Sequence, residues 1–227
     1  MAIICRDYNL LFIMTPRTAC TAIGKLLCEH YGGRFLPAED ILDSRGRIMV
    51  QRKHSTLSEL IRHRLLTREE ARSLLKVTAV RNPFDSLVSV YFKQRVKYQP
   101  LLRDPVSWVS RSPGYARRMK YAQKHSFNQW FFKISYRRLI RRLLLGQPSL
   151  FDDYTRGADM VLRYENLQED LKDVFRRASI PWKADIPVVN RTDERPNHDY
   201  RSFYSRPAAL VARFTYSHDV KTYGYKF

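Results

Sequence analysis

The sequence lacks any long apolar run, and this excludes several classes of protein. No stretch approaches the roughly 20 apolar residues of a membrane-spanning helix. Residues 2–5 are too few for the hydrophobic region of a signal peptide, and Arg6 and Asp7 interrupt them. We therefore expect a cytoplasmic protein with no membrane partner.

Cysteine is scarce as well. The three residues, Cys5, Cys20 and Cys28, form no CxxC pair and are odd in number. This pattern favours free thiols in a reducing compartment over a disulfide framework. No spacing of Cys and His matches a zinc site, so we expect no metal.

Acidic residues are few relative to basic ones. The chain has 22 Asp or Glu against 41 Lys or Arg, a net charge of +19 and a pI near 10.1. Residues 105–151 contain ten Lys or Arg and no acidic residue. This excess predicts anionic partners of some kind, but charge alone does not distinguish nucleic acid from a nucleotide or a sulfated product.

Length and composition indicate a globular protein. At 227 residues, 44% of them hydrophobic and with 14 Tyr and 12 Phe, the chain can bury a full core. We find no internal repeat, low-complexity segment or linker. The expectation is one domain covering residues 1–227.

The first informative stretch is a strand, a loop and a helix. Residues 10–14 form a short apolar run suited to a buried strand, and helical spacing of apolar residues begins at Ala22. The turn between them carries Arg17 and the hydroxyls of Thr15, Thr18 and Thr21. A loop that leads into a helix N-terminus binds anions, because the first helical N–H groups are unpaired. We interpret the loop as a phosphate or sulfate cradle; a plain strand and helix with an inert loop is the alternative.

Three other anion cradles are excluded. The chain has Gly24-Lys25, but not the first Gly and final hydroxyl of a Walker A loop. There is no GxGxxG fingerprint. A cysteine phosphatase would need Arg six residues after its nucleophile, and the residue six after Cys20 is Leu26.

A second strand-loop-helix unit covers residues 76–98. Residues 77–80 read as a β-branched buried strand, Asn82 as a helix N-cap and Pro83 as the first helical residue. Arg81 follows the strand, where ligands bind in open α/β sheets, and Ser89 lies two turns into the helix. The alternatives are a surface ion pair for Arg81 and simple packing for Ser89.

Other segments complete the outline. Residues 49–54 predict a short strand, and the pairs Thr56/Glu59 and Thr67/Glu70 predict capping boxes. Residues 159–164 predict a third strand with a helix after it, and one last helix contains Leu210. The basic block, residues 111–142, predicts amphipathic helices with solvated basic faces, and an anionic-acceptor site is the alternative. Its two apolar stripes are Phe127, Trp130, Phe131 and Ile134, then Tyr136, Leu139, Ile140, Leu143 and Leu144, with Arg137, Arg138, Arg141 and Arg142 falling away from the second.

Together these segments resemble the sulfotransferases that depend on PAPS, 3′-phosphoadenosine 5′-phosphosulfate. Residues 10–23, LLFIMTPRTACTAI, are similar to the family's 5′-phosphosulfate loop. Residues 77–92, VTAVRNPFDSLVSVYF, closely resemble its 3′-phosphate motif, and this match is the specific one. Residues 161–167, VLRYENL, and the ending VKTYGYKF resemble further family segments. The points span most of the sequence in the expected order.

The resemblance implies an α/β fold. This would be a mostly parallel central sheet flanked by helices and related to the P-loop nucleotide kinases, with PAPS as co-substrate and no metal. It places Arg81 and Ser89 at the 3′-phosphate, with Tyr164 and Arg201 also contacting PAPS. Many members have Lys where this chain has Arg17, so Arg17 is expected as a cation for the leaving phosphate, and its role as a proton donor is open. The residues assigned to the 5′-phosphosulfate are Arg17, Thr18, Ala19, Cys20, Thr21 and Ala22.

The acceptor hydroxyl needs a base, and histidine is best matched near neutral pH. Of six histidines, His54 follows a predicted strand and precedes a capped helix, at the sheet edge where ligands bind. Its segment Lys53-His54-Ser55 also resembles a short sulfotransferase segment. We therefore assign His54 as the general base; the alternative bases are His198 or a carboxylate. The alternative is a surface histidine beside a helix cap.

Two other functions stay open at this point. One is a basic nucleic-acid-binding protein, although no zinc-ligand spacing, RNP motif or helix-turn-helix is present, so we expect no nucleic acid. The other is a nucleotide-dependent kinase of related fold. The sequence does not identify the acceptor, which is a hydroxyl or amine of a small molecule, carbohydrate or peptide. A basic acceptor cleft would favour an anionic acceptor.

Overall fold

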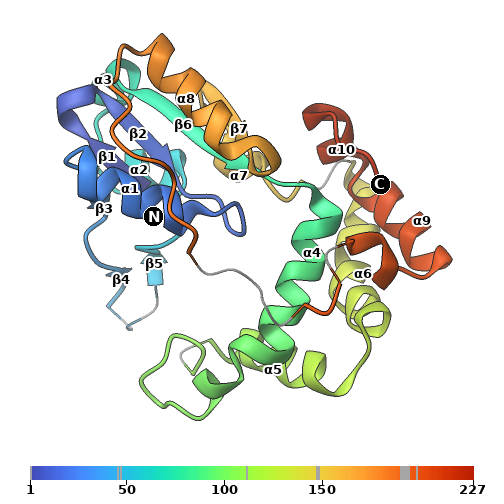
Figure 1. Ribbon diagram of the computed structural model, residues 1–227. Coiled ribbons are helices and arrows are strands. Elements are labelled where there is room, and N and C mark those ends of the chain that lie inside the picture. Colours follow the sequence, from blue (N-terminus) through green and yellow to red (C-terminus); the bar gives the residue numbers. More distant parts are fainter. Residues whose placement is uncertain are drawn as a thin grey trace. The chain divides into compact units, whose positions relative to one another are not determined.

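The computed structural model describes residues 2–44, 46, 48–110, 112–146, 149–189, 195–197 and 199–227 (Figure 1). The chain divides into two compact units. Residues 1–81 and 151–190 form the first, which we call the sheet unit. Residues 82–150 and 191–227 form the second, which we call the helical unit.

A five-stranded sheet organises the sheet unit. Its order is β3-β1-β2-β6-β7, and β2 pairs in parallel with β6, as β6 does with β7. The strand β1 runs antiparallel to both of its neighbours, β2 and β3. The sheet is therefore mixed but mostly parallel, and the expected α/β class is confirmed. The strands are β1 (Ala2–Cys5), β2 (Leu10–Ile13), β3 (Arg34–Leu36), β6 (Leu75–Val80) and β7 (Met160–Arg163).

Helices cover both faces of this sheet (Figure 1). Alternate residues such as Ile3 and Phe12 pack with α1 (Cys20–His30) and α8 (Leu167–Arg177). Their neighbours, such as Ile4 and Leu11, face the other side, where Leu60 of α2 (Leu57–Arg62) and the nearby Leu66 and Leu74 pack. Burial on both faces explains why β1 and β2 read as unbroken apolar runs.

The three parallel strands end at a common edge. Ile13 pairs with Thr78 in β6, and Val80 pairs with Arg163 in β7. The residues just after β2, β6 and β7 therefore lie at the carboxyl edge of the sheet, where ligands bind in α/β folds.

The segment before α2 differs from expectation. The predicted strand 49–54 is wrong in extent: β5 (Ile48–Val50) ends at Val50 and pairs only with β4 (Ile41–Leu42) in a separate two-stranded sheet. Beyond Val50 the backbone is held by local contacts, such as the Arg52 N–H donating to Asp40 Oδ1 at 2.5 Å. Both capping boxes are confirmed, at α2 and at α3 (Arg68–Ser73). The short α7 (Asp152–Thr155) leads into β7.

The described part of the helical unit contains helices and loops only. Asn82 caps the first helix by accepting from the Phe84 N–H at 3.0 Å, as expected. An aromatic core holds the unit together; in it the Trp130 Nε1–H donates to the buried Gln94 Oε1 at 2.9 Å. The α-helices are α4 (Pro83–Phe92), α5 (Pro113–Lys124), α6 (Phe127–Leu145), α9 (Arg206–Thr215) and α10 (Ser217–Tyr223).

The two apolar stripes of α6 differ in burial. The first is packed, with Trp130 and Phe131 fully buried. The second is exposed except at Leu139, which is half-buried, and the expectation that all four arginines point to solvent is wrong. Arg138 donates to the Tyr216 hydroxyl at 3.3 Å and Arg142 to Ser217 Oγ at 3.1 Å. Helical spacing shows which residues share a face, but not which face meets the core.

Gly33 provides a stability test of the turn after α1. Its N–H donates to the Leu27 carbonyl at 3.0 Å, and a Cβ at this position would lie 2.8 Å from that carbonyl. Because backbone must move, we expect Gly33→Ala to lower the free energy of unfolding by about 1–3 kcal/mol in urea titrations. Gly114 in α5 has open space around its Cβ position, so Gly114→Ala should be neutral or stabilising. Equal effects of the two substitutions would contradict the packing described for Gly33.

Candidate active site

Buried hydroxyls build the loop after β2. The Thr78 hydroxyl donates to the Ile13 carbonyl at 2.9 Å, so the Thr15 hydroxyl donates to Thr78 Oγ1 at 2.8 Å. The Thr18 hydroxyl donates to the Thr15 carbonyl at 2.9 Å. All three side chains are fully buried. The hydroxyls of Thr15 and Thr18 thus shape the loop, whereas Thr21 is half-buried at the start of α1.

The backbone of this loop carries three N–H groups that donate to no described backbone carbonyl. Arg17 and Ala19 adopt left-handed conformations, with φ of 73° and 56°. Within the described chain, the N–H groups of Thr18, Ala19 and Cys20 donate to no backbone carbonyl. Left-handed residues alternating along a loop turn successive N–H groups inward and create an anion-binding nest. The first turn of α1 contains no acidic residue, so its positive end adds to this field.

The nest is not a nucleophile site. Burial raises the pKa of the Cys20 thiol, although Lys53 and Arg17 oppose the shift, so the thiol stays protonated at neutral pH. Ala22 is buried and its N–H donates to the Ala19 carbonyl at 2.8 Å. Cys20 and Ala22 therefore fix the beginning of α1.

Arg81 joins the ends of three strands. It follows β6, and its guanidinium donates to the carbonyl of Arg17, in the loop after β2, at 3.2 Å. The same group lies 3.9 Å from the centre of the Tyr164 ring, which follows β7. Two of the residues assigned from sequence, Arg81 and Tyr164, thus lie beside the loop that carries Arg17.

His54 lies at the same edge. Its Nδ1 is 3.0 Å from the carbonyl of Met14, the first residue after β2. A carbonyl only accepts, so Nδ1 carries the proton and Nε2 keeps a lone pair. The ring of Tyr154, in α7, meets the imidazole edge-on with the ring centres 6.5 Å apart. The strand expected before His54 ends at Val50, and the contact with Met14 brings His54 to the predicted edge.

The surroundings keep His54 neutral. Burial lowers the pKa of its imidazole to about 4, and the positive charges of Lys53 and Arg17 act in the same direction against the bond to Met14. Burial, with Glu59 and Asp153, raises the pKa of Tyr154 to about 12. Sequence reasoning did not assign Lys53, although it adjoins His54, and no signal in the sequence pointed to Tyr154, a hundred residues away.

The remaining assigned residues belong to the helical unit. Ser89 is buried in α4. Arg201 is exposed, 4.9 Å from the Tyr200 ring centre and 3.5 Å from Asp199. Another histidine of this unit, His125, was not assigned to the site; it stacks on Tyr121 with ring centres 3.7 Å apart. The alternative base, His198, lies outside the described residues.

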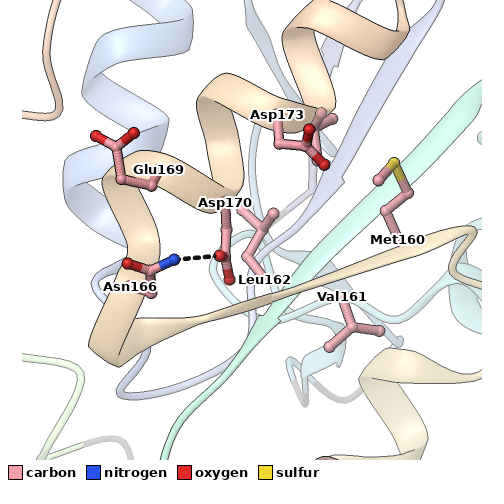
Figure 2. A pocket seen from close by; sticks show the side chains of 8 residues that line it. Met160, Val161, Leu162, Asn166, Glu169, Asp170 and Asp173 are labelled. Atoms are coloured by element: carbon pink, nitrogen blue, oxygen red, sulfur yellow. Dashed lines mark hydrogen bonds between the residues drawn. The ribbon is translucent and has the colours of Figure 1, made fainter.

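A pocket beside α8 has the wrong charge for an anion (Figure 2). Glu169, Asp170 and Asp173 line it with the strand β7, and Asn166 donates to Asp170 at 2.7 Å. Its carboxylates repel phosphate and sulfate. Across the described residues, no group of three or more His, Cys, Asp and Glu side chains is arranged to hold a metal ion. No described helix is long and apolar enough to cross a membrane.

The low pKa of His54 has a measurable effect on stability. The unfolded chain binds a proton at this side chain near pH 6.5, the folded chain only near pH 4. The unfolding free energy should therefore fall between pH 6.5 and 4, by up to about 3 kcal/mol from this group. In His54→Asn, whose amide can still donate to Met14, the loss over this range should be smaller. Urea titrations at pH 7 and 4 measure this loss. Equal losses in both proteins would refute the half-buried, neutral imidazole.

Comparison with known proteins identifies the family of the chain. The family model described as "Sulfotransferase family" matches residues 1–226. No curated protein and no solved structure matches the chain. The family match covers both units and includes the loop after β2, Arg81 and His54. The chain therefore belongs to the sulfotransferase family, whose chemistry is sulfuryl transfer.

Proposed function

We propose that the protein transfers a sulfuryl group from PAPS to a hydroxyl or amine of an acceptor. The observation that carries this proposal is the nest of N–H groups from Thr18 to Cys20, with Arg17 beside it and Arg81 bonded to its backbone. The nest fits the 5′-phosphosulfate of PAPS, because backbone N–H groups and a guanidinium both donate to anionic oxygens.

The same parts suit sulfuryl transfer without a metal. A sulfuryl group carries less charge than a terminal phosphoryl group, and its transfer resembles phosphoryl transfer, in which positioning and charge stabilisation dominate. Arg17 would neutralise charge on the leaving 5′-phosphate, and Lys53 adds a second cation near the nest. The guanidinium of Arg81, held against Tyr164, would bind the 3′-phosphate.

His54 supplies the base. The Nε2 lone pair would take the proton from the acceptor hydroxyl as the acceptor oxygen bonds to sulfur and the bond from sulfur to the phosphate oxygen breaks. A pKa near 4 makes the free imidazole a weak base. Binding of a polyanion beside Arg17 and Lys53 would offset their charges and raise the pKa of His54. The substrate would thus strengthen its own base.

Other parts of the proposal rest on the sequence alone. Ser89 and Arg201 stay assigned to PAPS by the resemblance. So do a single functional domain over residues 1–227, a cytoplasmic location and an acceptor that is a small molecule or a carbohydrate, anionic if the acceptor cleft is basic.

Labelled donors test the reaction. PAPS carrying radioactive sulfur, incubated with a panel of hydroxyl and amine compounds, should yield labelled product with at least one of them. ATP labelled in its γ-phosphate should label none, because the nest lacks the Walker hydroxyl that holds Mg²⁺. Transfer from ATP, and none from PAPS, would replace this proposal with a kinase.

The role of His54 can be tested once an acceptor is found. His54→Asn keeps a donor for the Met14 carbonyl but has no group that accepts the proton. Turnover should fall about 10²–10⁴-fold, the usual contribution of a general base. The affinity for PAP (3′-phosphoadenosine 5′-phosphate, which is PAPS without its sulfuryl group), measured by calorimetry, should stay near that of the wild type.

His30→Asn is the matched control. His30 is exposed at the end of α1, so this substitution should leave turnover unchanged. In addition, nuclear magnetic resonance should show the pKa of His54 rising when PAP binds. Near-normal turnover in His54→Asn would assign the base to another residue.

A further inference from the structure

The second half of α6 exposes an apolar stripe. Phe132, Tyr136, Ile140 and Leu143 are three or four residues apart and share one face. Their exposed fractions are 39%, 46%, 47% and 65%. Leu144, beside the stripe, and Leu145, on the opposite side of the last turn, are 75% and 78% exposed. Four large apolar side chains in one stripe differ from the scattered surface residues that need no explanation.

The core of the helical unit packs on the opposite side of α6. Phe127, Trp130 and Phe131 are buried there. Arg138 and Arg142 also turn to that side, toward Tyr216 and Ser217. The helix is therefore apolar on two sides, and the outer side is not needed for packing of this unit.

A row of cations borders the stripe. Lys133, Arg137 and Arg141 recur every four residues, and all three are exposed. The helical unit as a whole holds 21 Lys or Arg against 6 Asp or Glu, which is +15 of the chain's +19. The combination of an exposed apolar stripe with flanking cations is typical of helices that lie in a membrane interface.

The charge and shape distinguish between possible occupants. A second copy would bring a unit of the same +15 charge and repel the first. A partner protein would need a groove matching a helix ridge roughly 20 Å long. An anionic bilayer supplies negative charge at its surface and an apolar interior below it, and it adapts to a convex ridge.

We propose that this face of α6, from Phe132 to Leu145, docks on an anionic lipid surface. The apolar stripe enters the boundary between headgroups and acyl chains, and Lys133, Arg137 and Arg141 bind lipid phosphates. The helix lies on the membrane and does not cross it. This revises the sequence-based expectation of no membrane partner, and it is independent of the proposed sulfuryl transfer.

Vesicle sedimentation tests the proposal with the full chain. The protein should pellet with vesicles of phosphatidylcholine and phosphatidylglycerol, less so at high salt, and not with phosphatidylcholine alone. Leu143→Gln with Leu144→Gln should weaken partitioning about tenfold or more, since each leucine no longer buries apolar surface. Replacing Lys133, Arg137 and Arg141 together with Gln should weaken it on the order of a hundredfold.

A matched pair of exposed residues in the sheet unit serves as control. Leu42 and Met49 are 54% and 49% exposed, and Leu42→Gln with Met49→Gln should leave partitioning unchanged. Circular dichroism confirms that each variant is folded. The proposal fails if the protein does not bind anionic vesicles, or if the Leu143/Leu144 variant binds them as tightly as the wild type. It also fails if ultracentrifugation shows a dimer that this variant abolishes, because a second copy then covers the stripe.

Discussion

The contact between Arg81 and the carbonyl of Arg17 is the interaction on which the candidate site depends. It joins the end of β6 to the loop after β2, and the Tyr164 ring beneath the guanidinium adds the end of β7. An arginine can make these contacts together because its planar group stacks on an aromatic face while its N–H groups donate in the plane. A lysine would provide the charge without that geometry.

This constraint explains how the loop holds a strained backbone. A left-handed conformation at a residue other than glycine costs roughly 1–2 kcal/mol, and the loop has two of them, at Arg17 and Ala19. The buried hydrogen bonds of Thr15, Thr18 and Thr78 hold the loop in this conformation. Strained residues cluster at functional sites. An anion bound by the N–H groups of this loop would account for the strained backbone.

Sequence patterns predicted much of the fold, and fewer of the contacts. Unbroken apolar runs indicated β2 and β6, and capping residues indicated where α2, α3 and α4 begin, because these features act over a few residues. The strands β1 and β3 were not predicted; they are short and depend on pairing with distant partners. The sequence also did not predict which residues contact His54. Its bond to Met14 spans forty residues, and Tyr154 comes from a separate helix. The outward stripe of α6 was missed because spacing alone does not show which face is buried.

Calorimetry with PAP tests the central claim most directly. In buffer containing a chelator, the wild-type protein should bind PAP, because the site consists of N–H groups and cations. Arg81→Ala should bind PAP with about 1.5–3 kcal/mol less free energy, the scale of a hydrogen bond to a charged group. Arg176→Ala, which removes an arginine 80% exposed on α8, should bind as the wild type does. Unchanged affinity in Arg81→Ala, or PAP binding only when Mg²⁺ is added, would contradict the site described here.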